Sequence, residues 1–346
     1  MERCAKSFPQ VEGLIFRHES GATLIELMIA LAVGLVLLFG LSQIYLSSKQ
    51  AYRLMDAQSV LMESGRYALD ALSNELRLAG QQGCSRNAPL TVIATGQAQA
   101  LLVPDTAPHV PPGVIAAPVL SGEDDISVSA MPRIKPVLAG TDTLTLISAE
   151  FCGGVLGSRL LLTNPRGHLQ AGSTCRFDTG TPLMVASCES VHLFRAGASD
   201  QDLTQNVDQE GVATNRLGAL YRPGSELMAL RSRSFFLRLN PAGQPALYRV
   251  DHVADTVSEL VEGVENMQLN YGVDMTGDGA SDRIVNAAAV PDWSNVVSVR
   301  VRLTLRSIED RLLANTREYT LDDKRQSDRR LVHEFATTVA IRNRVQ

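Results

Sequence analysis

The longest apolar segment of the chain runs from Ala22 to Leu46 and contains one residue that is charged at neutral pH, Glu26. A helix rises about 1.5 Å per residue, and the hydrocarbon core of a bilayer is about 30 Å thick. The segment has no proline and is long enough to cross that core. The pattern therefore predicts a single membrane-spanning helix near the N-terminus.

The helical period continues beyond the apolar segment without a proline. Gly80 and Gly83 then supply stop signals, because glycine readily takes the left-handed conformation that ends helices. We expect one helix over residues 22–80, of which 22–46 lie in the membrane, while Gly34, Gly40 and Gly65 allow bending or close approach. The apolar stripe of its second half is Leu54, Leu61, Ala68, Leu72, Leu76 and Ala79.

The pattern changes to that of β-strands after Cys84. The clearest strand alternates buried-type and polar residues from Val297 to Arg306. Several prolines in 104–140 favour a long surface excursion there. Other expected strands are 141–147, 183–195, 234–240, 246–251, 266–273, 283–290 and 334–342. The sequence thus predicts an α+β chain in which an antiparallel β-rich domain occupies residues 81–346.

Composition narrows the class of protein. The 346 residues are 45% hydrophobic and 20% charged, with a formal net charge of −5, so the chain can bury a large core. The weakly acidic balance and the low aromatic content predict no nucleic-acid partner. The mixed charges of 322–330 are interpreted as a solvated loop.

The residues before the apolar segment predict its orientation and processing. Arg3, Lys6 and Arg17 favour a cytoplasmic N-terminus, so the β-rich domain would lie across the membrane. A secretory signal has its small-residue cleavage site after the apolar core, whereas here Gly21 precedes it. Cleavage after Gly21 would keep the helix and leave a free amine at Ala22.

This arrangement resembles the signal of type IV prepilins and pseudopilins, in which Gly21 is followed by Ala22 and an acid at the fifth mature position, Glu26. The resemblance implies a leader peptide over 1–21, cleavage by a prepilin peptidase after Gly21, and methylation of the amine of Ala22. It also implies that Glu26 draws in the amine of a neighbouring subunit during assembly. Ala22 departs from the phenylalanine usual at that position. The alternative is an ordinary signal anchor.

A narrower resemblance is carried by residues 45–54, 63–69, 76–80, 83–84, 271–274, 278–279, 293–297 and 337–344. These residues resemble the PilW family of type IV minor pilins. This resemblance implies a pilin-like fold and roles in pilus initiation, twitching motility and adhesion. It further implies an inner-membrane precursor with a periplasmic domain, later found in the pilus fibre or its tip. The implied partners are other minor pilins, the major pilin, a tip adhesin, the prepilin peptidase and the inner-membrane assembly platform.

Two alternatives of different kinds stay open. A type II secretion minor pseudopilin similar to GspJ would share the signal, the helix and a β-domain; the C-terminal run and the length favour PilW. A signal-anchored periplasmic enzyme would need a catalytic constellation, and no G-x-S-x-G, H-E-x-x-H or Walker-type motif is present. The histidines of this chain after the leader are interpreted as surface residues or as core residues with hydrogen-bond partners. They are His109, His168, His192, His252 and His333.

Four cysteines remain once the leader is removed, Cys84, Cys152, Cys175 and Cys188. In an oxidising periplasm such a set predicts two disulfides rather than a metal site, because it lacks C-x-x-C spacing. Three connectivities are open. A local bridge closing the glycine-rich insert favours Cys152 with Cys175, which pairs Cys84 with Cys188.

One stretch suggests a metal ligand set. Asp274, Thr276, Asp278 and Asp282 occupy the first, third, fifth and ninth positions of a calcium-type loop. Val285 stands where the bidentate acid of a complete loop would be, and the alternative is a polar hairpin between two strands. Apart from this structural calcium, the sequence predicts no cofactor.

Overall fold

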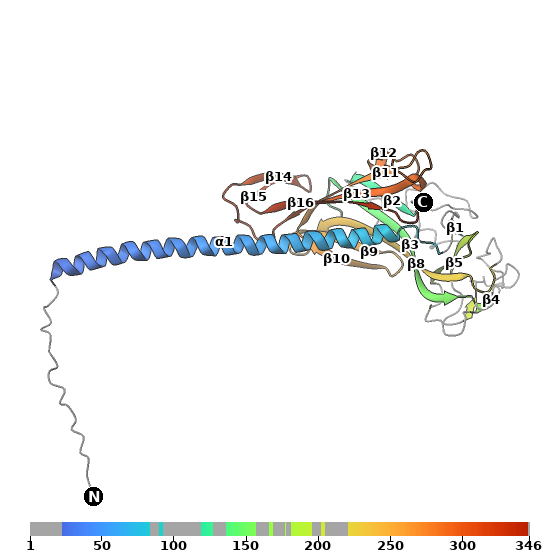
Figure 1. The fold of residues 1–346 in the computed structure, drawn as a ribbon, viewed down its shortest axis with the longest axis horizontal. Coiled ribbons are helices and arrows are strands. Elements are labelled where there is room, and N and C mark those ends of the chain that lie inside the picture. Colours follow the sequence, from blue (N-terminus) through green and yellow to red (C-terminus); the bar gives the residue numbers. More distant parts are fainter. Residues whose placement is uncertain are drawn as a thin grey trace, which may run out of the picture. The chain divides into compact units, whose positions relative to one another are not determined.

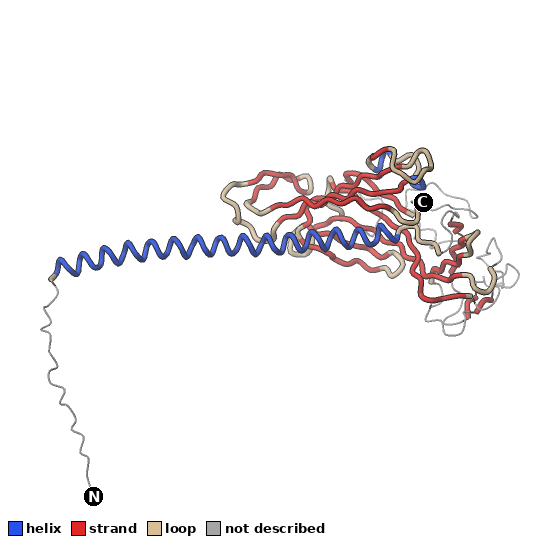
Figure 2. The backbone as a smooth tube through the Cα atoms, viewed as in Figure 1, coloured by secondary structure: helices blue, strands red, loops and turns tan. Residues whose placement is uncertain are grey.

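The computed structural model describes residues 23–83, 90–92, 119–126, 136–156, 166–168, 177, 181–195, 202–204 and 221–344. It contains one long helix, α1 (Leu24–Leu78), followed by β-structure (Figures 1 and 2). Contacts divide the chain into two units, Met1–Arg53 and Leu54–Gln346. The predicted α+β class, a long N-terminal helix before an antiparallel β-rich domain, is confirmed.

The second half of α1 belongs to the β-rich unit and packs there through the predicted stripe. Leu61, Ala68, Leu72 and Leu76 are buried in the main core. The helix ends at Leu78, and Gly80 just beyond it has a φ of +72° and donates its N–H to the backbone oxygen of Ile147 at 3.0 Å. The end of the helix is therefore fixed to the sheet.

The larger sheet has eight strands and supplies one part of the core. Strands that are distant in the sequence lie next to each other in this sheet. One pair of strands, β1 with β6, is parallel. Its strands in spatial order are β1 (Leu90–Val92), β6 (Val191–Arg195), β5 (Pro182–Ala186), β8 (Glu226–Leu239), β3 (Thr141–Val155) and β2 (Leu120–Ile126), with β9 (Pro245–Asp251) beside β8 and β10 (Thr256–Glu262) beside β9.

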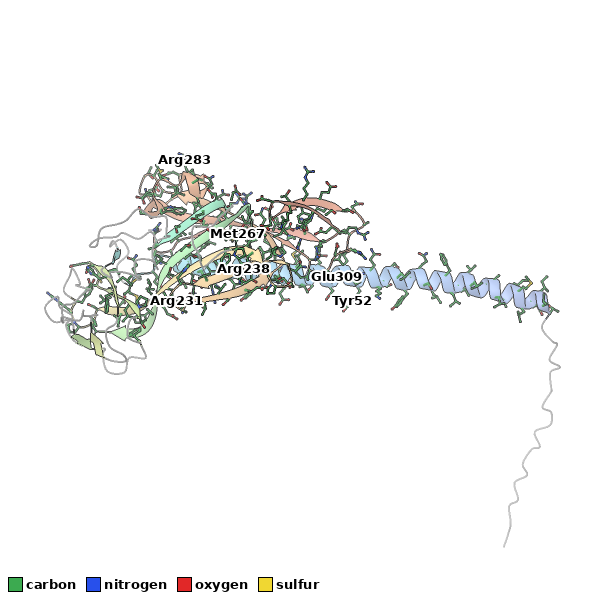
Figure 3. All side chains as sticks on the ribbon, turned by 180° about the vertical axis from the view of Figure 1, so that it is seen from behind. Tyr52, Arg231, Arg238, Met267, Arg283 and Glu309 are labelled. Atoms are coloured by element: carbon green, nitrogen blue, oxygen red, sulfur yellow. The ribbon has the colours of Figure 1, made fainter. Side chains whose placement is uncertain are left out.

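A four-stranded antiparallel sheet supplies the other part of the core. Its side chains Met267, labelled in Figure 3, and Leu303 are fully buried. Its strands in spatial order are β12 (Arg283–Val285), β11 (Val264–Val273), β13 (Val296–Arg306) and β16 (Val332–Ala340).

Two further sheets have two strands each, β14 (Arg317–Leu321) with β15 (Lys324–Asp328) and β4 (Arg166–His168) with β7 (Asp202–Thr204). Two short 3-10 helices are η2 (Ala287–Ala289) and η3 (Trp293–Asn295).

Asp142 joins the two sheets. One oxygen of its buried carboxylate accepts the N–H of Asp125 on β2 at 2.9 Å, and the other accepts the N–H of Leu269 on β11 at 2.6 Å. Burial raises the pKa of Asp142 to about 6, although these N–H donors oppose the rise. Asp142 thus satisfies backbone donors of both sheets, which would otherwise cost free energy when buried.

Four sequence interpretations need correction. The segment 183–195 is two strands, β5 and β6, and the segment expected at 283–290 is a short strand followed by η2. The proline-rich stretch 104–140 contains β2 among its described residues. The charged run 322–330 is not a solvated loop, because it contains β15 and the buried Asp328. The pairing of β1 with β6 is parallel, which is an exception within the confirmed antiparallel class.

Candidate assembly site

The first turn of α1 is closed by a reciprocal pair, Thr23 and Glu26. The carboxylate oxygen Oε2 of Glu26 accepts the backbone N–H of Thr23 at 2.9 Å and its hydroxyl at 3.1 Å. In return, the backbone N–H of Glu26 donates to Oγ1 of Thr23 at 3.3 Å. This is a capping box, which satisfies helix N–H groups that have no partner within the helix.

The capping box holds Glu26 at the helix start and uses one of its two carboxylate oxygens. Among the described residues, Oε1 of Glu26 accepts no hydrogen bond, and the side chain is exposed. A carboxylate at a helix N-terminus is favoured by the helix dipole. The geometry leaves an acceptor for a cation. Gly21 and Ala22 lie outside the described residues.

The helix from Leu24 to Leu46 presents apolar side chains all round. Leu24 is 78% exposed and Phe39 is 67% exposed, and one window of α1 is long and apolar enough to cross a membrane. The serine hydroxyls are satisfied within the helix, since Ser42 donates to the oxygen of Leu38 at 2.8 Å. Such a surface requires lipid or other apolar helices around it.

The acidic loop 274–282 connects the antiparallel strands β11 and β12. Asp274 accepts backbone N–H groups from Thr276, Gly277 and Gly279, at 3.0, 2.6 and 2.8 Å. These bonds hold the pKa of Asp274 below its usual range, and the bond from Gly279 contributes most to this effect. Asp282 accepts the N–H of Met275 at 2.7 Å.

The carboxylates of this loop are therefore engaged in backbone turns. Asp278 likewise accepts the N–H of Ala280 at 2.8 Å. Within the part of the chain that the structure describes, no group of three or more His, Cys, Asp or Glu residues could hold a metal ion. Calcium binding through Asp274, Thr276, Asp278 and Asp282 stays a prediction.

Cys188 is the one predicted disulfide cysteine whose side chain the structure describes, and it forms a disulfide bond. It lies between β5 and β6, in the turn closed by Ser187 and Ser190. The side chains of Cys84, Cys152 and Cys175 fall outside the described residues. The pairing of these cysteines stays a prediction.

A buried serine–histidine contact appears that the sequence did not reveal. Oγ of Ser234 on β8 lies 2.7 Å from Nε2 of His252, which is the geometry of a nucleophile and its base. Ser234 is fully buried, however, and its Oγ also contacts Oγ1 of Thr145 on β3 at 2.7 Å. The contact therefore satisfies polar groups inside the sheet, where a substrate has no access.

The other histidines follow the predicted pattern where they are described. Nδ1 of His192 on β6 bonds the hydroxyl of Tyr221, and burial lowers the pKa of this histidine. His333 is exposed on β16, with its ring edge-on to Phe335. The side chains of His109 and His168 lie outside the described residues.

Comparison with known families gives two matches. Residues 16–42 match the prokaryotic N-terminal methylation motif, and residues 234–343 match type IV pilus-assembly protein W. No curated protein and no solved structure matched the chain. The first match covers Gly21, Ala22 and Glu26, and the second covers β11, β13 and β16 of the four-stranded sheet.

The two matches agree with the arrangement of the chain. A prepilin-type signal on an apolar helix makes this a membrane-anchored protein with a C-terminal domain. The family is a structural component of pilus assembly rather than a group of enzymes. The two matches therefore support a resemblance of this chain to the PilW family of type IV pilus-assembly proteins.

Proposed function

We propose that the chain is a minor pilin of a type IV pilus. Its precursor is held in the inner membrane with the C-terminal domain in the periplasm. A prepilin peptidase cuts after Gly21 and the new amine of Ala22 is methylated. The match of residues 16–42 to the methylation motif supports this processing, since it includes both residues and the acid at Glu26.

The observation that carries the mechanism is the position of Glu26. A charged side chain in an apolar helix costs up to about 3 kcal/mol near the centre of a membrane, and less near its surface. The capping box fixes this carboxylate at the first turn and leaves Oε1 without a hydrogen bond among the described residues. The methylated amine of a neighbouring subunit would supply the missing partner as the helix leaves lipid for a bundle of like helices.

The proposed partners follow from assembly. Other minor pilins and the major pilin would meet the apolar helix, a tip adhesin would meet the exposed domain, and the peptidase and assembly platform would act in the membrane. The functions are pilus initiation, twitching motility and adhesion. The match over residues 234–343 favours a pilus over a type II secretion machine.

The N-terminus of the mature protein tests this proposal. Mass spectrometry of the membrane fraction should find a peptide beginning at methylated Ala22, present only in cells that contain the prepilin peptidase. A Gly21→Leu variant serves as the uncut control, since a bulky residue blocks the site. An intact leader in wild-type cells would overturn the pilin assignment.

A deletion strain tests the role in the pilus. It should lack or strongly reduce surface pili and twitching, and the wild-type gene should restore both. Normal piliation together with impaired protein secretion would instead support the secretion pseudopilin.

A further inference from the structure

The outward face of β13 carries a short row of arginines. Val299, Val301 and Leu303 of this strand are buried in the core, so the alternate residues Arg300 and Arg302 lie on the opposite face. Arg300 is exposed and Arg302 is partly exposed. These two positive charges are separated by about 7 Å along the strand, at about 3.4 Å per residue.

The neighbouring strands place no acid directly beside either arginine. Arg300 stands between Asn270 on β11 and Thr338 on β16. Arg302 stands between Gln268 on β11 and Ala336 on β16. The cross-strand neighbours that usually compensate charge on a sheet are thus neutral. Along β16, the nearest acid by register is Glu334, which is opposite Thr304.

Neither arginine has a partner within the described part of the chain. No hydrogen bond or ion pair there involves Arg300 or Arg302, and Nε of Arg302 is buried without an acceptor. Arg306, on the same row, differs. Its guanidinium donates to the hydroxyl of Tyr319 at 2.6 Å and to Oε1 of Gln244 at 3.0 Å. Among the described residues, acceptors are therefore present for Arg306 and absent for Arg300 and Arg302.

An unpaired arginine pair of this kind fits carboxylates. A guanidinium binds a carboxylate through two parallel N–H donors, and on this face the side chain of Arg300 is exposed and that of Arg302 is partly exposed. The small side chains of Ala336 and Thr338 beside the row leave room for an incoming segment. Anionic lipid would call for exposed apolar or aromatic anchors, whereas the flanking side chains are amides, alanine and threonine.

We propose that the face formed by Arg300, Arg302, Ala336 and Thr338 is a docking surface for an acidic segment of a neighbouring pilus subunit. The segment would present two carboxylates about 7 Å apart, as acids at alternate positions of an extended chain do. The identity of the partner as a pilus subunit rests on the proposed function. The preference for paired carboxylates rests only on the two arginines of this face, Arg300 and Arg302.

The binding test uses the full chain in detergent micelles and a short fluorescent peptide with glutamate at alternate positions. The Arg300→Gln/Arg302→Gln variant should bind this peptide about tenfold more weakly than the wild type, and added salt should weaken wild-type binding. The control variant Lys324→Gln/Arg325→Gln removes the same charge from the exposed hairpin. It should bind like the wild type.

Three outcomes would overturn the proposal: no binding of the glutamate peptide, equal binding by the Arg300→Gln/Arg302→Gln variant, or the same loss of binding in the control variant.

A separate experiment uses vesicles that contain anionic lipid. Vesicle binding that depends on Arg300 and Arg302, without peptide binding, would assign the face to a membrane instead. Because this test needs no pilus, its result is independent of the N-terminal processing that tests the proposed function. Unchanged thermal unfolding of both variants shows that they remain folded.

Discussion

Gly65 of α1 lies directly against the ring of Phe335 on β16. A Cβ added at Gly65 would lie 2.3 Å from the ring atoms, a distance that van der Waals repulsion forbids. This contact brings the helix backbone onto the edge of the four-stranded sheet. Glycine is thus required here for close approach, although it disfavours a helix by about 1 kcal/mol relative to alanine.

We therefore expect Gly65→Ala to lower the free energy of unfolding by about 1 to 2 kcal/mol, because overpacking exceeds the gain in helix propensity. Urea unfolding of the full chain in micelles, followed by the fluorescence of the single tryptophan, Trp293, measures this change. In a Phe335→Leu background the same substitution should cost less. Stabilisation by Gly65→Ala in the wild-type background would contradict the contact.

Arg233 on β8 links α1 to the larger sheet. Its guanidinium forms ion pairs with Glu75 of the helix and with Asp251 on β9, the latter at 3.2 Å. The three side chains are between 12% and 18% exposed, so removal of the cation leaves two poorly solvated carboxylates. We expect Arg233→Ala to destabilise the domain by about 2 to 4 kcal/mol.

Arg231, on the same strand, provides the matched control. Arg231 is labelled in Figure 3. It pairs with Glu150, and the two side chains are 30% and 50% exposed, respectively. Arg231→Ala should therefore cost less than about 1 kcal/mol. A double-mutant cycle of Arg233→Ala with Glu75→Ala measures the coupling across the helix–sheet contact. Equal costs for the two arginine variants would show that burial does not decide their contributions.

Asp142 should make stability depend on pH. Its pKa is raised to about 6 in the folded chain, whereas an unfolded aspartate titrates near about 4. Between these values the folded state binds more protons than the unfolded state, so stability falls as pH rises through this window. The full effect is about 3 kcal/mol, at about 1.4 kcal/mol per pKa unit.

Unfolding free energies from pH 4 to 7 test this expectation. In Asp142→Asn the decrease between pH 4 and 6 should be smaller, because the titrating group is gone. The variant also loses an acceptor for the N–H of Leu269 or Asp125, so its absolute stability is expected to fall. The comparison therefore concerns slopes rather than absolute values. Parallel pH profiles for the two proteins would show that Asp142 has an ordinary pKa.

Local patterns predicted the parts of the fold that depend on local geometry. The helical stripe from Leu61 to Leu76 and the alternation along β13 give buried faces in the structure as expected. Each pattern indicates which face of a single helix or strand packs against the core, and this depends only on residues close together in the sequence. Strand order and the parallel pairing of β1 with β6 depend on distant segments, and no local pattern carries them.

The hairpin of β14 and β15 shows why the mixed charges of 322–330 wrongly predicted a solvated loop. Asp328 is 8% exposed, and its carboxylate accepts the hydroxyl of Tyr319 at 2.9 Å and pairs with Arg306, Arg317 and Arg330 at 3.5 to 3.7 Å. A run of mixed charges is usually solvated, but these arginines compensate the acid inside the protein. One of them, Arg306, comes from another sheet, which the sequence does not disclose.

The assembly role of Glu26 stays a prediction, and the local structure around this residue was not predicted. The sequence singled out Glu26 by the cost of a charge in an apolar helix. The pattern Thr-x-x-Glu at Thr23 and Glu26 is also that of a capping box, and the structure shows this second role. The acid thus has an intrachain partner, Thr23, in addition to the intermolecular partner that the proposed assembly mechanism would supply.

These two roles of Glu26 are separable by mutation. Thr23→Ala removes the cap, worth about 1 kcal/mol, and keeps the charge. Glu26→Gln keeps an oxygen that can accept from Thr23 and removes the charge. If the charge recruits the amine of a neighbouring subunit, Glu26→Gln should reduce the amount of protein in sheared pili by about tenfold, as expected for loss of about 1.4 kcal/mol. Thr23→Ala should reduce it much less.

Processing and incorporation are measured in the same cells. Mass spectrometry of the membrane fraction reports cleavage after Gly21, and immunoblots of sheared pili report incorporation. Both variants should be cleaved, because neither removes Gly21, so a defect in sheared pili would arise at assembly. An equal defect in Thr23→Ala and Glu26→Gln would show that assembly depends on the helix cap, and the amine-pairing role of Glu26 would then be wrong.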